Sequence, residues 1–302
     1  MTSTSTTQAV LLCFEDEQAS GVRVAQAAHL GFAQIERHRF PDGEIRLRLP
    51  PTLPERVVIL RTLNDPNEKL VELLLAAQTA RGLGARHLTL LAPYLAYMRQ
   101  DVAFHPGEAV SQRIVGHFLA DLFDAMVTVD PHLHRVATLQ EAVPVASTVV
   151  LSGASLLSDL IAARRKNPLL IGPDEESAQW LAQAAARHGF EHAVCRKVRT
   201  GDRAVEVALP DVVLAGRQVV LLDDMASTGH TVARAAQLLL SAGATCVDVA
   251  VTHALFASDA MQTILAAGVG EVWSTDCIPH SSNAVSMAAP LAEALTRILA
   301  TA

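Results

Sequence analysis

The sequence predicts an α/β protein made of two related halves, each a mainly parallel sheet flanked by helices. Short apolar runs typical of buried strands alternate with segments of helical periodicity along the chain, and this alternation is typical of parallel sheets. Both halves also repeat a strand that runs into acidic residues, at Thr128–His132 and at Leu221–Asp224. A chain of 302 residues is long for one core. We therefore predict domains at 1–145 and 146–302.

The first half is expected to begin with a strand at Ala9–Phe14 and a helix at Ser20–Leu30. Further apolar runs predict strands at Gln34–Phe40, Ile45–Leu49, Val57–Leu60, His87–Ala92 and Met126–Val129. Helical periodicity predicts helices at Asn67–Arg81 and Ser111–Asp121.

The second half begins with a β-rich run near Val145. Apolar runs predict strands at Leu169–Gly172, Ala193–Arg196, Val219–Leu222, Cys246–Thr252 and Glu271–Thr275. Helical patterns follow at Leu156–Arg164, Ser177–His188, Val232–Leu240, Met261–Ala267 and Ala288–Leu299. The last of these helices could pack back on the first domain.

Composition restricts the class of protein. A net charge of −7 argues against a nucleic-acid-binding surface, and no apolar run reaches the length of a membrane span. The four cysteines lack the paired spacing of a zinc site or a disulfide framework. These observations predict a cytoplasmic protein. The chain also has no GxxxxGK[ST] motif, which excludes an ordinary P-loop kinase.

Several loops carry candidate functional residues, and each has a simpler structural explanation. Pro41-Asp42-Gly43 is a strong turn signal, so a tight hairpin is the favoured explanation of Phe40–Glu44, although Phe40 could stack on a base. Arg99 could bind phosphate or form a surface salt bridge. His132 is a metal candidate at a strand end, although lone histidines are usually structural. The charged segment from Lys197 to Ala204 is expected to be an exposed, mobile loop.

The most informative stretch is Val219–Thr231, in which a strand, an acidic turn and a helix start follow one another. Ser227, Thr228 and Thr231 offer hydroxyls at a helix N-terminus, which suits a phosphate dianion. The carboxylates of Asp223 and Asp224 need another partner, either sugar hydroxyls or a metal ion. An ordinary strand-to-helix turn is the less favoured alternative.

In this order, the motifs resemble those of ribose-phosphate diphosphokinases, also called phosphoribosyl-diphosphate synthetases, which have the type I phosphoribosyltransferase fold. The resemblance covers nearly the whole chain from about Cys13 onward. The motifs that carry it are FPDGE at 40–44, RQD at 99–101, DPH at 130–132, PD at 173–174, KxR at 197–199, DDMxSTGxT at 223–231 and TDCIPHSSN at 275–283. Each motif is weak alone, and their common order makes the match specific.

The resemblance implies that ATP transfers its diphosphoryl group to ribose 5-phosphate, with Mg²⁺ as cofactor. It implies two phosphoribosyltransferase-like domains, the first with the ATP segments and the second with the ribose 5-phosphate loop. The implied ATP-binding residues are Phe40, Asp42, Gly43, Glu44, Arg99, Gln100 and Asp101. The implied ribose 5-phosphate residues are Asp223, Asp224, Ser227, Thr228, Gly229, His230 and Thr231. His132 and Asp174 would be metal ligands, and Lys197 and Arg199 would be catalytic.

The sequence departs from the family pattern at two places. Glu175, Glu176 and Ser177 follow the Pro-Asp motif where Gly-Gly is frequent, and His230 stands where Gly is common. Extra acids there could weaken anion binding or recruit another cation. The segment Phe104–Ala109 and the short C-terminus look more like archaeal-type members. The strongly ADP-regulated bacterial members end differently, which puts inhibition by ADP in doubt.

Two other functions are weighed against synthesis. A catalytically weak regulatory paralogue should lack Lys197, Arg199 or the acidic pair, and all four residues are present. A nucleobase phosphoribosyltransferase should be one shorter domain without the FPDGE and RQD segments. In the family, the hairpin completes the ATP site of a neighbouring subunit. We therefore expect at least a homodimer, with a hexamer left open, and no nucleic acid or membrane partner.

Overall fold

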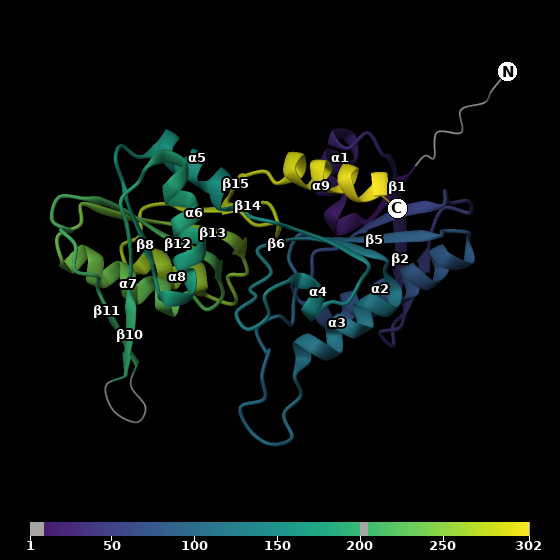
Figure 1. The fold of residues 1–302 in the computed structure, drawn as a ribbon, viewed down its shortest axis with the longest axis horizontal. Helices are drawn as coiled ribbons and strands as arrows, with labels where there is room; N and C mark the ends of the chain where they lie inside the picture. Colours follow the sequence, from purple (N-terminus) through teal and green to yellow (C-terminus); the bar gives the residue numbers. More distant parts are fainter. Residues whose placement is uncertain (1–8, 200–204, 302) are drawn as a thin grey trace. The chain divides into compact units, whose positions relative to one another are not determined.

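The computed structural model describes residues 9–199 and 205–301. The chain divides into two units, of which the first comprises Met1–Leu151 with Met287–Ala302 and the second comprises Ser152–Ser286 (Figure 1). The predicted boundary between two family domains, at residues 145 and 146, stays a prediction. Both units have a largely parallel sheet flanked by helices, so the predicted fold class is confirmed.

The first unit is built on a seven-stranded sheet with the order β3-β2-β1-β4-β5-β6-β7, counted over the described residues. All neighbours are parallel except β2 and β3, which form an antiparallel pair. The strands are β1 Val10–Phe14, β2 Gly31–Arg39, β3 Ile45–Arg48, β4 Arg56–Leu60, β5 His87–Ala92, β6 Ala125–Val129 and β7 Ser147–Leu151. The central strands are apolar along their length because helices cover both faces.

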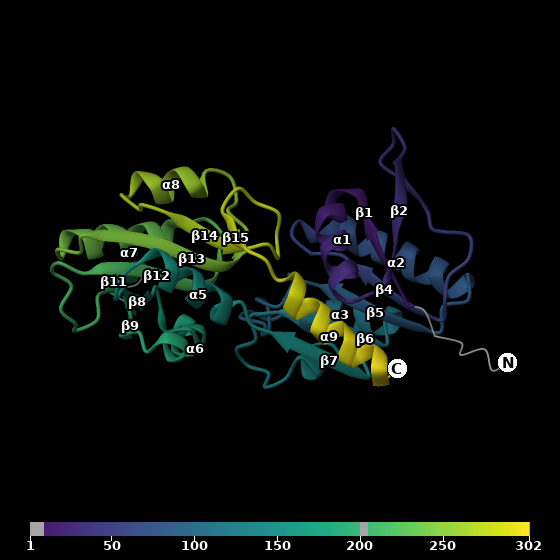
Figure 2. The same ribbon diagram turned by 90° about the horizontal axis from the view of Figure 1, so that it is seen from above.

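Helices of the first unit lie on both faces of this sheet. They are α1 Gln18–Ala27, α2 Pro66–Gly82, α3 Ser111–Leu122, the short α4 Leu139–Ala142 and α9 Ala288–Thr301, with a 3-10 turn η1 at Glu15–Glu17. In Figure 1, α1 and α9 lie on one side of the sheet and α2 and α3 on the other. Helix α9 packs on α1 and β7, and Figure 2 shows it along β7.

The second unit contains a six-stranded sheet, again counted over the described residues, with the order β15-β14-β13-β12-β8-β9. Its strands are β8 Leu169–Gly172, β9 His192–Val194, β12 Gln218–Ala226, β13 Cys246–Ala254, β14 Val272–Thr275 and β15 Asn283–Val285. A separate antiparallel pair consists of β10 Arg196–Arg199 and β11 Val205–Ala208. The helices are α5 Ala154–Arg164, α6 Ala178–His188, α7 His230–Ser241 and α8 Ala260–Ala266, with a 3-10 turn η2 at Glu175–Ser177.

The apolar run of β12 explains how this sheet is buried on both faces. Val219 and Leu221 pack in one apolar cluster, which includes residues of α7 and α8. Val220 and Leu222 pack in the other cluster, with residues of α5 and α6. Successive side chains of a strand point to opposite faces, so a continuous apolar run is what a sheet between two helical layers requires.

The predicted elements are largely confirmed, with shifted ends, whereas α4, β15 and the β10–β11 pair were not predicted. Parallel strands end at the same edge of a sheet, where α/β proteins bind ligands. Most of the candidate segments follow such strand ends. Among the described residues, each helix is either too short or too polar to span a lipid bilayer.

Candidate active site

The segment Phe40–Glu44 forms the tip of the β2–β3 hairpin in the first unit. The backbone N–H of Phe40 donates to the oxygen of Glu44 at 2.8 Å, and the N–H of Gly43 donates to Phe40 at 3.0 Å. Gly43 has a φ of +95°, a conformation that glycine adopts without strain. The tight hairpin is therefore confirmed. Its strands project away from the rest of the first unit (Figure 2).

Phe40 remains accessible at this tip. Its side chain is 38% exposed and meets the ring of His38 edge-on, with ring centroids 4.8 Å apart. The carboxylate of Asp42 accepts the N–H of Glu44 at 3.2 Å, which shapes the turn. An exposed aromatic face on a defined turn can stack on a planar base.

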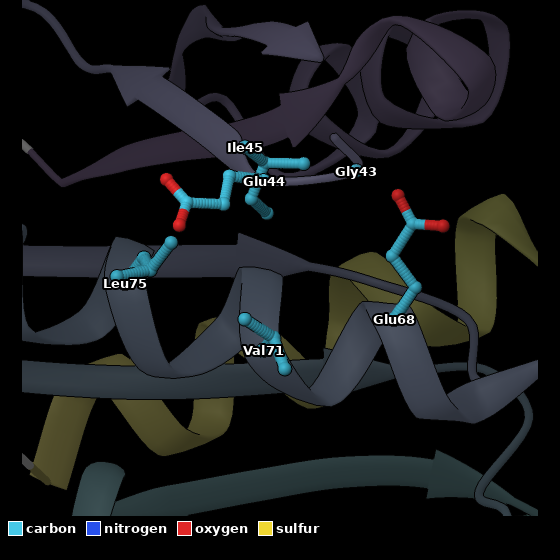
Figure 3. A pocket seen from close by; sticks show the side chains of 6 residues that line it. All are labelled: Gly43, Glu44, Ile45, Glu68, Val71 and Leu75. Atoms are coloured by element: carbon cyan, nitrogen blue, oxygen red, sulfur yellow. The ribbon is translucent and has the colours of Figure 1, made fainter. Parts of the chain in front are cut away.

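Ionic contacts fix the hairpin to helix α2. Arg37 pairs with Glu72, and Arg39 pairs with Glu68. Between hairpin and helix lies a cavity of about 310 Å³, lined by Gly43, Glu44, Ile45, Glu68, Val71 and Leu75. Figure 3 shows Glu68 rising from α2 toward the hairpin. The hairpin is thus oriented by α2 and leaves an open space beside Glu44.

The loop after β5 carries the next candidate residues, Arg99, Gln100 and Asp101. Arg99 is exposed at the surface, and the amide of Gln100 donates to the oxygen of Val102 at 3.0 Å. The carboxylate of Asp101 is only 3% exposed and pairs with the guanidinium of Arg135. Arg99 can therefore reach an anionic ligand, whereas Asp101 joins this loop to the loop after β6.

The loop after β6 brings two imidazoles together. His132 Nε2 lies 2.8 Å from His134 Nε2. Asp130 and His132 have φ values of +37° and +53°, in the left-handed region that non-glycine residues rarely adopt. The sequence pointed to His132 but to neither His134 nor Arg135, because no local pattern shows that the loop turns back on itself.

In the second unit, the acidic pair lies within a strand. Strand β12 continues to Ala226, and Asp223 is paired with Val251 of β13. The predicted acidic turn is therefore wrong: pairing with the long neighbouring strand keeps the backbone extended past the acids. The N–H of Asp224 donates to Asp223 Oδ1 at 3.0 Å.

The electrostatics of this pair are unusual. Asp224 is buried, with 2% of its surface exposed. Burial, followed by the charges of Asp224 and Asp174, raises the pKa of the Asp223 carboxyl well above its usual range. Such a carboxyl is stabilised by hydroxyl donors or by a cation.

Asp174 follows β8, the strand beside β12. Its carboxylate accepts the N–H of Glu176 at 3.0 Å, and its backbone oxygen accepts the hydroxyl of Ser177 at 2.6 Å. Ser177 packs against Gly172, where an added Cβ would lie 2.1 Å from the Ser177 hydroxyl oxygen. The residues that replace the frequent Gly-Gly thus close a 3-10 turn around Asp174.

The segment Ser227–Thr231 leads from β12 into α7. Gly229 has a φ of +75° and precedes the first residue of the helix. The backbone oxygen of Ser227 accepts the N–H of Ala257 at 3.0 Å, which ties the loop to the end of β13. Thr228, His230 and Thr231 are exposed at the helix N-terminus, where the helix dipole favours an anion.

Lys197 and Arg199 lie in β10, paired in register with Val207 and Val205 of β11. The predicted loop is therefore wrong for residues 197–199, and residues 200–204 of that prediction lie outside the described residues. Antiparallel pairing with a segment across the intervening residues stabilises the extended backbone, which local charge does not reveal.

The TDCIPHSSN segment forms a hydrogen-bonded loop after β14. The amide of Asn283 donates to the hydroxyl of Ser274 at 2.9 Å and to the oxygens of Thr275 and Ile278 at 2.6 and 3.1 Å. The ring of His280 lies against Phe256, with centroids 4.9 Å apart. This motif thus shapes the edge of the sheet beside the end of β13.

Comparisons with known proteins agree over most of the chain. Residues 9–122 match the model of the N-terminal domain of ribose phosphate pyrophosphokinase, and residues 147–266 match the phosphoribosyl transferase domain. A ribose-phosphate pyrophosphokinase of Methanopyrus kandleri is 36% identical over 292 residues, which cover 96% of this chain and 99% of that protein. One of Methanosarcina acetivorans is 32% identical over 280 residues, covering 91% and 95%.

A solved structure is similar over nearly the same length. The phosphoribosylpyrophosphate synthetase from Mycobacterium smegmatis matches with a TM-score of 0.83 and 24% identity, covering 98% of this chain and all of that one. At this identity the likeness concerns the fold. The structural match covers both units. The similarity in fold and the similarity in sequence therefore extend over the same part of the chain.

Proposed function

The chain belongs to the ribose-phosphate pyrophosphokinase family, and we propose that it transfers the diphosphoryl group of ATP to the 1-hydroxyl of ribose 5-phosphate. The products are 5-phosphoribosyl 1-diphosphate and AMP. The observation that carries this proposal is the 36% identity over 96% of the chain, because it spans the substrate segments of both units. Neither alternative function is favoured by these relatives.

The second unit binds ribose 5-phosphate in this proposal. Ser227, Thr228, Gly229, His230 and Thr231 surround the 5-phosphate, which the N-terminus of α7 attracts. Asp223 and Asp224 accept hydrogen bonds from the ribose hydroxyls. The raised pKa of Asp223 supports this role, since hydroxyl donors relieve the repulsion between the neighbouring carboxylates.

The first unit binds ATP. Phe40 stacks on the adenine, and Asp42, Gly43 and Glu44 shape the hairpin tip that receives it. Arg99 contacts phosphate oxygens, which its exposure supports. Gln100 and Asp101 complete this segment, and the pairing of Asp101 with Arg135 holds the loop in place.

The family generally needs a divalent metal ion, and we propose Mg²⁺, with His132 and Asp174 as protein ligands. The carboxylate of Asp174 fits a hard ion, and Mg²⁺ needs only one or two protein ligands because substrate oxygens and water complete its shell. When bound, such an ion neutralises charge on the phosphoryl oxygens. Asp174 is held by its contact with Glu176, so its carboxylate is already oriented.

Lys197 and Arg199 are the proposed catalytic residues. Transfer of a diphosphoryl group depends on alignment and on positive charge near the transferring phosphorus. The two residues lie two positions apart in β10. A lysine and an arginine together can supply the positive charge that this transfer needs.

We propose that the functional assembly is at least a homodimer in which the hairpin completes the ATP site of a neighbouring copy. The exposed ring of Phe40 supports this arrangement. An apolar groove of about 330 Å³ between α2 and α3 also supports it, since exposed apolar surface often marks an interface. The groove is lined by Leu70, Val71, Leu74, Ile114, Val115 and Phe118. A hexamer built from such dimers is also compatible.

We propose that the protein works in the cytoplasm. All four cysteines are free thiols, and burial raises the pKa of Cys13 to about 12 and, with the charge of Asp174, that of Cys195 to about 11. Thiols of this kind are unreactive and suit a reducing compartment.

The decisive experiment is a turnover assay with purified protein, ATP, ribose 5-phosphate and Mg²⁺. Formation of AMP in equal amount to 5-phosphoribosyl 1-diphosphate is expected. If AMP does not form and the protein instead activates a second, active synthetase, it is a regulatory subunit. If the protein instead forms a nucleotide and diphosphate from 5-phosphoribosyl 1-diphosphate and a nucleobase, it is a phosphoribosyltransferase.

A further inference from the structure

The loop after β6 holds two histidines in an arrangement that a single metal ion could occupy. His132 Nε2 and His134 Nε2 are 2.8 Å apart, and the two rings are nearly perpendicular, with centroids 4.1 Å apart and an interplanar angle of 85°. Two imidazoles bound to one ion, each at about 2.1 Å, have nitrogens about 3.4 Å apart at tetrahedral angles and about 3 Å apart at the right angles of octahedral coordination. The observed separation is close to the latter value.

The backbone of this loop is bent to create the arrangement. Asp130 and His132 both have positive φ, at +37° and +53°. Asp130 is 5% exposed, and its N–H donates to the oxygen of Leu151 at 2.9 Å, which fixes the start of the loop. Sparsely populated backbone conformations persist where the surroundings enforce them, and they concentrate at functional sites.

A hydrogen bond between two neutral imidazoles is the simpler explanation of the same distance. It requires one Nε2 to donate and the other to accept. The hydrogen bond and a shared ion require similar separations of the nitrogens, and they differ in whether a divalent ion binds to the pair. A cation bound by both nitrogens is compatible with nearly the same separation, and the bent backbone is what brings the two rings together.

We infer that His132 and His134 together bind one divalent transition-metal ion, such as Mn²⁺, Co²⁺, Ni²⁺ or Zn²⁺, in preference to Mg²⁺. Imidazole nitrogen suits these ions, and affinity rises from Mn²⁺ toward Ni²⁺ and Cu²⁺. Mg²⁺ prefers oxygen and sheds water reluctantly. The inference rests on the proposed function only in that His132 is also the proposed Mg²⁺ ligand.

The site has a consequence for the proposed reaction. An ion on two imidazoles keeps several coordination positions for water or for phosphate oxygens of ATP. His134 would then decide which divalent ion the loop retains when no nucleotide is bound. Removal of His134 should leave His132 as a single imidazole, which binds transition ions weakly.

The test measures metal binding without nucleotide, because ATP itself binds divalent ions. Untagged protein is stripped with chelator, dialysed and titrated with Co²⁺, with calorimetry and the visible absorption of Co²⁺ as readouts. The variants are His134→Asn, His132→Asn and, as matched control, His117→Asn, which alters an exposed histidine of α3 that contacts the backbone oxygen of Arg113. Circular dichroism checks that each variant is folded.

The expected result is one Co²⁺ site in the wild type and in His117→Asn, weakened at least about tenfold in His134→Asn and in His132→Asn. A hundredfold excess of Mg²⁺ should not displace the ion. If His134→Asn unfolds, His134→Gln gives the same comparison. Co²⁺ affinity that is equal in wild type and in both loop variants would mean a hydrogen-bonded imidazole pair only, and would overturn the inference.

The outcome is independent of the turnover assay with Mg²⁺. Turnover without His134-dependent Co²⁺ binding supports the proposed function and rejects the metal site. Co²⁺ binding that needs both histidines, in a protein without turnover, supports the metal site and rejects the proposed function.

Discussion

Arg61 and Glu72 form an ion pair in which both side chains are withdrawn from solvent. Arg61 Nη2 lies 2.5 Å from Glu72 Oε2, and the side chains are 2% and 0% exposed. Arg61 also contacts Asp16 at 2.8 Å and Glu17 at 3.3 Å, and its guanidinium lies 4.5 Å from the ring centroid of Phe14. A buried guanidinium is thus surrounded by three carboxylates at the end of β4.

This cluster joins two segments proposed to bind ATP. On one side, Glu72 also pairs with Arg37 at the base of the hairpin. On the other side, Glu17 accepts the N–H of Thr62 at 2.6 Å, and the Thr62 hydroxyl accepts the N–H of Tyr94 at 3.1 Å. Tyr94 begins the loop that leads to Arg99. The orientation of both segments therefore depends on the same buried charges.

Arg61→Met should destabilise the first unit strongly. Removal of the guanidinium leaves Glu17 and Glu72 buried without their main counter-charge, and breaking a buried ion pair typically costs about 3–5 kcal/mol. Both tryptophans, Trp180 and Trp273, belong to the second unit. Hydrogen exchange of β4 amides is therefore the suitable measurement.

The control is Arg48→Met, which removes an exposed pair with Glu36 in the hairpin, where the side chains are 73% and 62% exposed. Such exposed pairs contribute little to stability, because water and salt screen their charges. Equal loss of protection in the two variants would contradict a stabilising role for the buried cluster.

Glu17→Gln should change the pH dependence of stability. Burial raises the pKa of Glu17 from 4.5 to about 7, against the opposing charges of Arg61 and Lys69 and with the help of Asp16. The native state binds the proton of Glu17 more tightly than the unfolded state. Stability therefore falls as the pH rises from 4.5 to about 7. The glutamine amide does not titrate, so the variant should not show that loss. The free energy of unfolding of the variant should therefore rise relative to that of the wild type by up to about 3 kcal/mol as the pH goes from 5 to 8.

The measurement is urea unfolding of both proteins at the two pH values, followed by circular dichroism. The glutamine can still accept the N–H of Thr62, so the hydrogen bond is matched. A constant difference between the proteins across this range would show that Glu17 does not titrate there.

Gly229→Ala should weaken ribose 5-phosphate binding. At a φ of +75°, a Cβ would lie 3.0 Å from the oxygen of Ala260 and from a side-chain carbon of Ile264, so the loop before α7 must shift. Gly216→Ala is the matched control, because its φ is +78° and nothing lies within 4 Å of its Cβ. Both variants should lose about 1 kcal/mol of stability from the backbone conformation.

Calorimetry with ribose 5-phosphate separates the two effects. The control should retain the wild-type affinity, whereas Gly229→Ala should lose at least about tenfold, or about 1.4 kcal/mol. The same affinity in both variants would mean that the position of the α7 N-terminus does not matter for phosphate binding.

Prediction from sequence succeeded where local chemistry decides the structure. Pro41-Asp42-Gly43 encodes its turn within three residues, and the hairpin formed as expected. It failed where distant pairing decides: Asp223 and Asp224 disfavour a strand, yet β13 keeps β12 extended through them. The β10–β11 pair was not predicted for the same reason, because it also depends on pairing between segments that are separated in the sequence.

Side-chain clusters were the hardest features to predict. Arg61 follows an apolar strand, and its partners Asp16, Glu17 and Glu72 come from two other elements. The contact between His132 and His134 depends on left-handed backbone, which no sequence pattern specifies. The family motifs identified residue types for the site, but not these neighbours.

Lys197→Ala should reduce turnover far more than it weakens ATP binding. Its charge is proposed to act on the transferring diphosphoryl group, where charge develops in the transition state. A loss on the order of ~10²-fold in kcat is expected by analogy with removal of a preorganised donor. Steady-state kinetics, with ATP affinity measured separately, would exclude this role if kcat fell less than tenfold.

The proposed ATP site is shared between two copies of the chain. If the hairpin of one copy serves the neighbouring copy, Phe40 and Lys197 of one chain belong to different sites. Phe40→Ala should raise the KM for ATP by removing base stacking and leave the KM for ribose 5-phosphate nearly unchanged. Lys197→Ala should be nearly inactive at any ATP concentration.

Mixing these two variants gives the decisive result. After subunit exchange, one kind of site in the mixed dimer combines an intact Phe40 hairpin from one copy with an intact Lys197 from the other. Activity at low ATP should therefore exceed that of either variant alone, up to about a quarter of wild type, because half of the dimers are mixed and half of their sites are intact. If mass spectrometry confirms exchange and activity does not rise, each site uses the hairpin and the lysine of a single chain.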